Sequence, residues 1–134
     1  MNDKLTVFTD GAARGNPGPA AIGVVIKDEK GNNVAAISRC LGSTTNNQAE
    51  YRGIIAALEK AVSLGARQVT VYSDSELMVK QINGQYRIKN AALKPLYAEA
   101  VKLTGRLDIF KISHIRREQN SEADALANKA LDGK

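Results

Sequence analysis

The chain has 134 residues, of which 43% are hydrophobic and 25% charged, and its 19 Lys and Arg exceed its 14 Asp and Glu to leave a net charge of +5. This length and composition exclude collagen-like, disordered and membrane-spanning classes and predict one globular domain over residues 1–134. No run approaches the roughly 20 apolar residues of a membrane helix, and the N-terminus lacks a signal-peptide pattern, so we expect a cytoplasmic protein with no membrane partner.

Three β-prone runs open the chain. Residues 5–9 predict a strand that ends at Asp10, and the Gly- and Pro-rich residues 11–19 predict a loop. Residues 20–28 and 34–41 predict two further strands joined by a tight turn. Because connections this short join antiparallel strands, we expect a meander.

The remaining elements are mostly helices that alternate with strands. Apolar residues at helical spacing predict a long helix over residues 48–65, with N-cap candidates among residues 44–47. A predicted strand over residues 68–73 then closes on Asp74. Further along we predict helices over 75–82 and 92–104, a strand over 107–115, and a helix over 121–131 capped by Asn120 or Ser121. The order β-β-β-α-β-α-α-β-α predicts an α/β fold with a mixed sheet and crossover helices.

Two acidic residues follow predicted parallel strands in matching contexts. Asp10 and Asp74 each come two residues after an aromatic, Phe8 or Tyr72, so the aromatic and the acid project to the same side of each strand. Sites in such sheets form beyond the carboxyl ends of parallel strands. A single acid at a strand end is often a plain surface residue, whereas two acids with matched flanks favour a site.

Two more acids lie near predicted helix starts. Glu50 and Asp124 both suit the helix dipole, and Glu50 could serve only as the capping-box partner of Asn47. If all four acids converge, their mutual repulsion requires neutralising cations. Carboxylate oxygens without a Cys or His cluster favour Mg²⁺ or Mn²⁺ over zinc, and two such ions suit phosphodiester hydrolysis.

Basic residues gather in two stretches of the chain, which favours a polyanionic partner such as nucleic acid. A solvated basic surface would have the same pattern. The first stretch, which contains no acid, holds Lys80, Arg87, Lys89 and Lys94, and the second holds Lys111, His114, Arg116 and Arg117.

Four motifs together resemble type 1 ribonuclease H: TDGAARGNPGPA (9–20), TTNNQAEY (44–51), VYSDS (71–75) and NSEADALAN (120–128). They span almost the whole chain, in the family's order and at similar spacing, which is more specific than any single motif. The resemblance is to the compact bacterial and archaeal subgroup. It implies a ribonuclease H-like mixed five-stranded sheet with flanking helices. It also implies endonucleolytic cleavage of the RNA strand of RNA/DNA hybrids, leaving 5′-phosphate and 3′-hydroxyl ends.

The resemblance also implies roles for individual residues. It matches the family's metal ligands, which bind two Mg²⁺ or Mn²⁺ ions per active site with substrate, to Asp10, Glu50, Asp74 and Asp124. Amides that reach the hybrid's minor groove match Asn16, Asn46 and Asn47, and a hydroxyl that holds a DNA-strand phosphate matches Thr45. We expect further substrate contacts from Arg14, Arg87, Lys89 and Arg117. Asn46 or Asn47 could instead serve mainly as a helix cap.

Departures from the family's pattern leave alternatives open. The family's basic, aromatic-rich protrusion is reduced to residues 84–89, and Glu76 replaces a frequent neutral amide. The family's catalytic loop histidine matches His114, although His114 also fits the predicted strand, in which case an arginine within residues 116–119 would replace it. We expect a monomeric enzyme. The alternatives are a non-catalytic module that binds hybrid or duplex, and a nuclease of broadened range that includes double-stranded RNA.

Overall fold

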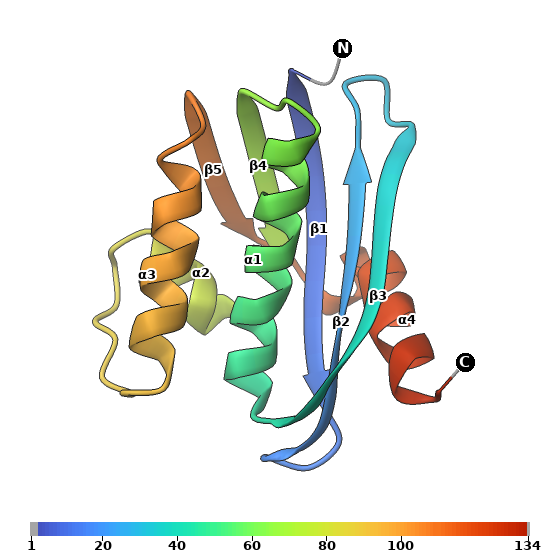
Figure 1. Cartoon of the computed structure of the whole chain (residues 1–134), viewed down its shortest axis with the longest axis vertical. Coiled ribbons are helices and arrows are strands. Elements are labelled where there is room, and N and C mark those ends of the chain that lie inside the picture. Colours follow the sequence, from blue (N-terminus) through green and yellow to red (C-terminus); the bar gives the residue numbers. More distant parts are fainter. Residues whose placement is uncertain (1–2, 134) are drawn as a thin grey trace.

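A computed structural model describes residues 3–133, which form a five-stranded sheet in the order β3-β2-β1-β4-β5 (Figure 1). β2 pairs antiparallel with β1 and β3, whereas β4 pairs parallel with β1 and β5. The predicted mixed five-stranded sheet of an α/β fold is therefore confirmed. The strands are β1 (Lys4–Ala13), β2 (Gly18–Lys27), β3 (Asn33–Thr44), β4 (Gln68–Ser73) and β5 (Ile109–His114).

β1 is longer than predicted because its two edges pair over different lengths. Its parallel register with β4 ends at Thr9 opposite Ser73, whereas its antiparallel register with β2 continues to Ala13 opposite Ala20. The prediction that this strand ends at Asp10 is wrong, since pairing with β2 overrides the local turn signals. Asp10 instead lies inside β1, one residue beyond the end of the parallel pairing.

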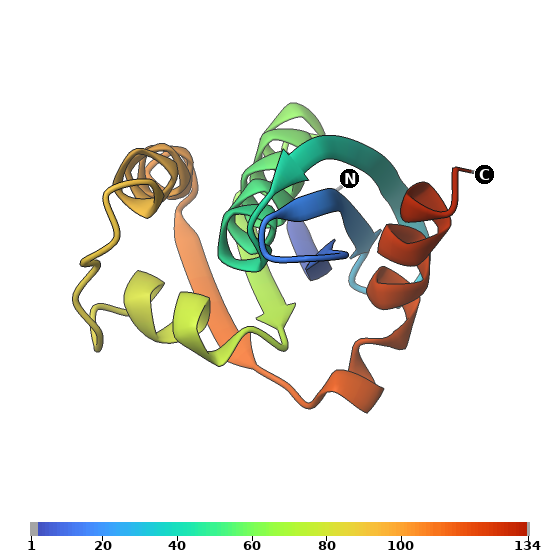
Figure 2. The same ribbon diagram turned by 90° about the horizontal axis from the view of Figure 1, so that it is seen from below.

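Helices cover both faces of the sheet. α1 (Asn46–Ser63), α2 (Glu76–Ile82) and α3 (Leu93–Thr104) lie on one face, and α4 (Ser121–Leu131) lies on the other (Figure 2). The short 3₁₀ helix η1 (Arg117–Gln119), which has no counterpart among the predicted elements, leads into α4. This arrangement brings α1 and α4 to the same end of β1 from opposite sides (Figures 1 and 2).

The main hydrophobic core lies between α1 and the sheet. Ile54 and Leu58 of α1 and Val7 of β1 are fully buried there. α4 instead packs through small residues, because the buried Ala123 and Ala127 face β2. Within the described residues, no helix is both long enough and apolar enough to cross a membrane.

Candidate active site

Asp10 and Asp74 come together because β1 and β4 are parallel neighbours. Phe8 and Tyr72 lie directly opposite each other in this pairing, and their stacked rings have centroids 5.3 Å apart. Two residues further on, the carboxylates of Asp10 and Asp74 approach each other at the end of the pairing. The expected convergence of these two acids is confirmed.

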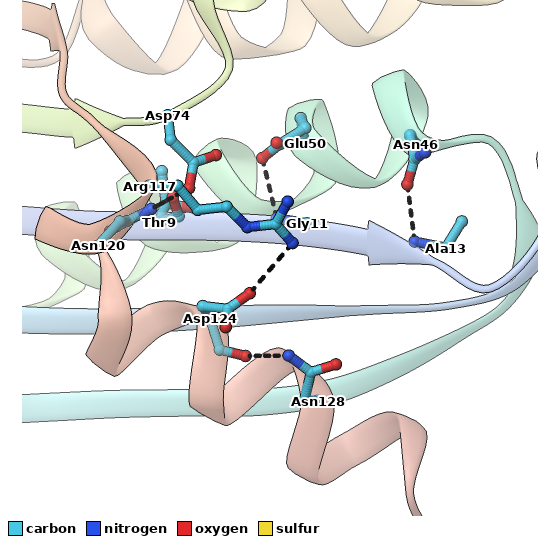
Figure 3. Close-up of polar contacts among 10 residues, drawn as sticks. All are labelled: Thr9, Gly11, Ala13, Asn46, Glu50, Asp74, Arg117, Asn120, Asp124 and Asn128. Carbon is cyan, nitrogen blue, oxygen red and sulfur yellow. Dashed lines mark hydrogen bonds and ion pairs between the residues drawn. The ribbon is translucent and has the colours of Figure 1, made fainter.

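Glu50 reaches the same place because α1 lies against β1 at Gly11. A Cβ atom on Gly11 would lie only 2.3 Å from the carbonyl carbon of Ala49 and 2.5 Å from the nitrogen of Glu50, so this contact requires glycine. The backbone N–H of Gly11 donates to Oε1 of Glu50 at 2.9 Å (Figure 3).

The capping box of α1 does not involve Glu50. The side chain of Thr45 accepts a hydrogen bond from the backbone N–H of Gln48, and the side chain of Gln48 accepts one from the N–H of Thr45. The alternative that Glu50 serves as capping partner of Asn47 is therefore wrong. Thr45 holds the N-cap position instead, which leaves the Glu50 carboxylate free to turn toward β1.

The three acids form a compact group that can hold a cation. Asp10, Glu50 and Asp74 each offer one carboxylate oxygen, and these oxygens all lie within 4.8 Å of one another. Asp10 is only 5% exposed and Glu50 only 9%. Because like charges this close repel strongly in a buried setting, the group is stable in its ionised form only with a positive partner.

The ionisation of the group reflects this crowding. Burial, the charge of Asp74, and the hydrogen bond and charge of Asp124 together raise the pKa of Asp10 from 3.8 to about 8. Burial and the charges of Asp10 and Asp74 also raise the pKa of Glu50 well above its usual 4.5, although the Gly11 N–H and the Arg117 charge act in the opposite direction. A hard divalent cation would relieve both effects.

Asp124 lies beside this group on α4. It directly follows Ala123, whose carbonyl packs against Gly23, the strand partner of Asp10, and its charge contributes to the raised pKa of Asp10. Its Oδ1 lies 3.9 Å from Nη2 of Arg117 (Figure 3). The four predicted acids therefore gather at one place, with three in a tight group and Asp124 at its side. The helix dipole that favours an acid early in α4 does not exclude this second role for Asp124.

The approach of α4 depends on Gly23 of β2, which lies opposite Asp10 in the strand register. A Cβ atom on Gly23 would lie 1.9 Å from the carbonyl oxygen of Ala123 and 2.7 Å from the backbone nitrogen of Ala127. Real side chains do not tolerate such contacts. Because Gly23 has no side chain, α4 can pack close enough to β2 for Asp124 to lie near Asp10.

A pocket of about 360 Å³ opens over the acids. Asn46 and Asn47 at the start of α1 form part of its wall, and Arg117 of η1 forms another part. The side-chain oxygen of Asn46 accepts the N–H of Ala13 at 2.8 Å, which fixes its orientation at the pocket wall (Figure 3). The structure thus brings three of the predicted substrate residues to the acids.

Two other predicted substrate residues lie next to this wall but are engaged elsewhere. The side-chain oxygen of Asn16 accepts the N–H of Asn46 at 3.0 Å, so Asn16 helps to hold the start of α1. Nη2 of Arg14 pairs with Oδ1 of Asp132 at 2.6 Å, beyond the C-terminal end of α4. These bonds connect the β1–β2 loop to the start of α1 and to the C-terminal end of α4.

The remaining candidates lie away from the acidic pocket. Arg87 and Lys89 lie between α2 and α3, where Arg87 lines a separate pocket of about 320 Å³ with Tyr86. His114 is the exposed last residue of β5. Its charge helps to lower the pKa of Glu76, after the larger contributions of the Lys80 hydrogen bond and charge. His114 is not among the residues that line the acidic pocket.

Sequence reasoning overlooked Asn120, which it considered only as a cap. Asn120 holds the N-cap position of α4, but its side chain makes no capping hydrogen bond. Its Nδ2 instead donates to the carbonyl of Thr9 at 2.9 Å and to Oδ2 of Asp74 at 3.4 Å. No local signal distinguishes these two uses of an Asn before a helix.

Comparisons with known proteins match almost the whole chain. Residues 8–130 match the family model described as reverse transcriptase-like. Ribonuclease HI of Halobacterium salinarum is 42% identical over 129 residues, which cover 96% of this chain and 65% of that protein. The chain spans only 36% of the length of the mycobacterial relatives that it also matches at 42% identity.

Solved structures show the same fold. The crystal structure of RNase H1 from Halobacterium salinarum has a TM-score of 0.95 and 41% identity, and the match covers 98% of this chain and 99% of that one. LC11-RNase H1, solved in complex with an RNA/DNA hybrid, has a TM-score of 0.92 and 44% identity, with 96% of this chain and 97% of that one covered.

Proposed function

The chain belongs to the ribonuclease H family, and from this premise we propose that it is an endonuclease that hydrolyses the RNA strand of RNA/DNA hybrids. The products would carry 5′-phosphate and 3′-hydroxyl ends. The observation that carries the proposal is the convergence of Asp10, Glu50 and Asp74, with ligand atoms within 4.8 Å, at the wall of a pocket that is also lined by the amides of Asn46 and Asn47. The hybrid bound by a similar protein supports the choice of substrate.

The acid group fits hard divalent cations. We propose that Asp10, Glu50 and Asp74, with Asp124 beside them, hold two Mg²⁺ or Mn²⁺ ions together with substrate, because all four offer only oxygen ligands. When bound, such ions supply Lewis acidity for the attacking water and the leaving oxygen. The protein's own contribution is to hold these carboxylates close together in a largely buried pocket.

The side chains around the pocket suit the recognition of a hybrid. Asn46 and Asn47 present amides that can donate to and accept from ribose 2′-hydroxyl groups, which distinguish RNA from DNA. Asn16, which accepts the N–H of Asn46, lies next to them and can also reach the minor groove, and the hydroxyl of Thr45 can hold a phosphate of the DNA strand. Arg117, on another part of the wall, can pair with a phosphate of the RNA strand.

The test is an assay with defined substrates. A labelled RNA/DNA hybrid incubated with the folded protein and Mg²⁺ or Mn²⁺ should be cut in its RNA strand. Binding of the hybrid without cleavage in either metal would contradict the proposal and favour a non-catalytic module. A folded protein that neither binds nor cuts the hybrid would contradict both the endonuclease and the non-catalytic binding module.

A broadened substrate range is the second candidate function. Glu76 at the start of α2 lies two residues after Asp74 in the chain, and its exposed carboxylate pairs with Lys80 at 3.1 Å. A carboxylate accepts hydrogen bonds from any ribose hydroxyl, so it can also accommodate a second RNA strand. Parallel assays of hybrid, RNA duplex and DNA duplex decide this, since equal rates on both RNA-containing duplexes would exclude strict specificity for hybrids.

We also propose that the protein acts as a monomer in the cytoplasm. Its exposed large hydrophobic residues are dispersed over several elements, as Leu77, Tyr86, Val101 and Ile109. Its single cysteine, Cys40, is free, as is usual in reducing compartments. Size-exclusion chromatography with light scattering should give a mass near 14.4 kDa.

Addition of Mn²⁺ or Mg²⁺ should raise the melting temperature of the protein. Cations that bind only the folded state stabilise it by about 2.7 kcal/mol at a hundredfold excess over Kd, which corresponds to roughly 10 °C for a domain of this size. Differential scanning fluorimetry with a metal titration, reversed by EDTA, measures this shift. Glu29→Gln, at an exposed acid, should respond like the wild type. An unchanged melting temperature at millimolar metal would contradict a metal site.

Replacement of Arg117 by Ala should lower kcat on the hybrid by about tenfold, because a cation at the pocket wall would be lost. Arg116→Ala is the matched control, since Arg116 is an adjacent exposed cation that does not line the pocket. His114→Ala completes the comparison. A larger loss in His114→Ala than in Arg117→Ala would assign the assisting role to the histidine, and equal losses in both arginine variants would show only a general charge effect.

A further inference from the structure

Asn120 is a buried polar residue at the junction of three elements. It is only 1% exposed and lies between η1 and the start of α4, close to the carboxylates (Figure 3). Its Nδ2 donates to the carbonyl of Thr9 in β1 and to Oδ2 of Asp74 after β4, at 2.9 Å and 3.4 Å. One side chain therefore connects both strands that carry acids to the helix that carries Asp124.

Each hydrogen-bond partner of the Asn120 side chain is an acid or directly precedes one in the chain. Thr9 directly precedes Asp10, and Asp74 is itself a partner. The backbone N–H of Asp124 donates to the carbonyl of Asn120 at 3.1 Å, in the first turn of α4. Asn120 therefore contacts the segments that hold three of the four acids.

The bonding pattern of Asn120 is not the one that stability alone would favour. Its Oδ1 is buried without a hydrogen-bond partner among the described residues, which costs folding free energy. It also makes no side-chain cap to α4, although Asn is among the best N-cap residues. The amide is directed toward the acids instead.

We propose that Asn120 is a positioning residue, which orients Asp74 and the start of α4 so that the carboxylates bind divalent cations together. The inference rests on the proposed function. A carboxylate held through one oxygen presents the other in a fixed direction, and partners of this kind tune the affinity of metal ligands. Asn120 touches neither the substrate nor the reacting atoms in this role.

The test is Asn120→Ala, with Asn83→Ala as the matched control. The side chain of Asn83 also donates from Nδ2 to a strand carbonyl, that of Ile112 at 3.2 Å, but it makes no bond to an acid. Both variants lose a side-chain bond to a strand, so both should melt at a somewhat lower temperature. Only Asn120→Ala should weaken Mn²⁺ binding, by about 10- to 100-fold in Kd measured by calorimetry.

Kinetics on the hybrid provide a second measurement. At low Mn²⁺, Asn120→Ala should lower kcat by a similar factor with little change in KM, because Asn46 and Asn47 at the pocket wall are unaffected. Higher Mn²⁺ should restore much of the lost rate. If Asn120→Ala does not fold, Asn120→Ser replaces it, since Ser preserves the N-cap preference but is too short for both bonds.

The outcomes separate this inference from the proposed function. A wild-type protein that neither binds Mn²⁺ nor cuts the hybrid would overturn the proposed function. A wild type that does both, with a folded Asn120 variant of unchanged Mn²⁺ affinity and kcat, would overturn the positioning role alone. Equal losses of Mn²⁺ affinity in the Asn83 and Asn120 variants would also overturn it, because the effect would then be only structural.

Discussion

Asp10→Asn is expected to reduce cleavage of an RNA/DNA hybrid by about a thousandfold or more while the protein remains folded. Asp10 is only 5% exposed, and the negative charges of both Asp74 and Asp124 act on its carboxylate and raise its pKa. Loss of one ligand charge removes several kcal/mol of interaction with the cations, and each 1.4 kcal/mol is about tenfold in rate. The rate is measured with labelled hybrid at saturating metal, and folding is checked by circular dichroism.

The same substitution should make the metal-free protein more stable. Asn has nearly the same shape as Asp but carries no charge, so it relieves repulsion among the buried carboxylates. We expect a gain of about 2 kcal/mol, or roughly 5–10 °C in melting temperature. Glu29→Gln, which removes an exposed acid, should change neither quantity. Cleavage by Asp10→Asn at a rate near that of the wild type would exclude Asp10 from the metal site.

The stability that Asp10→Asn gains over the metal-free wild type should increase as pH rises. Because the pKa of Asp10 is raised from 3.8 to about 8, the folded state binds more protons than the unfolded state between these values. The contribution of Asp10 to stability therefore falls as pH rises from about 4 to 8. Metal-free wild type and Asp10→Asn should thus differ little near pH 4 and most near pH 8, as measured by urea denaturation in EDTA. If the two proteins differ in stability by the same amount at both pH values, the ionisation of Asp10 is not the source of the instability.

Gly23→Ala is expected to lower both stability and activity, because it separates α4 from β2. The added Cβ would lie 1.9 Å from the carbonyl oxygen of Ala123, which belongs to the helix backbone and cannot turn aside. Overpacking of this kind costs about 1–3 kcal/mol, and we expect the upper end of this range, or roughly 10 °C in melting temperature. Thermal denaturation of the metal-free protein measures the loss.

The functional part of this prediction follows from Asp124. Because Asp124 is next to Ala123, displacement of α4 moves its carboxylate away from Asp10, and cleavage should fall by at least about tenfold even where the variant is fully folded. Gly105→Ala is the control, since Gly105 has a helical φ of −65° and its Cβ would lie 3.3 Å from the nearest atom. If Gly23→Ala and Gly105→Ala show equal changes in melting temperature and cleavage rate, close packing at Gly23 does not position Asp124.

Local patterns in the sequence were sufficient to predict most of the elements. Hydrophobic periodicity and cap residues predict the helix Ser121–Leu131 and the strand Gln68–Ser73 with the bounds that the structure has. The order of elements predicts a mixed sheet, and four motifs together identify the family and its four acids. These features depend on neighbouring residues in the chain, which is why they can be read without a structure.

The tertiary structure decided which partner each polar group has. The sequence shows that Asp10 follows a β-prone run, but pairing with β2 carries β1 past it to Ala13. Asn120 precedes a helix and reads as its cap, yet its amide bonds Thr9 and Asp74, which are 111 and 46 residues away in the chain. Such partners depend on strand register and on close approach of backbones, as at Gly23.

The sequence by itself therefore determined the kinds of element, their order and the acids that could bind a metal. Only the folded chain decided that three acids lie within 4.8 Å of one another, that Asp124 joins them from the opposite face of the sheet, and that Arg117 lies at the same pocket. The physical reason is that helix and strand propensities act over a few residues, whereas the position of a side chain relative to distant residues is set by the packing of whole elements.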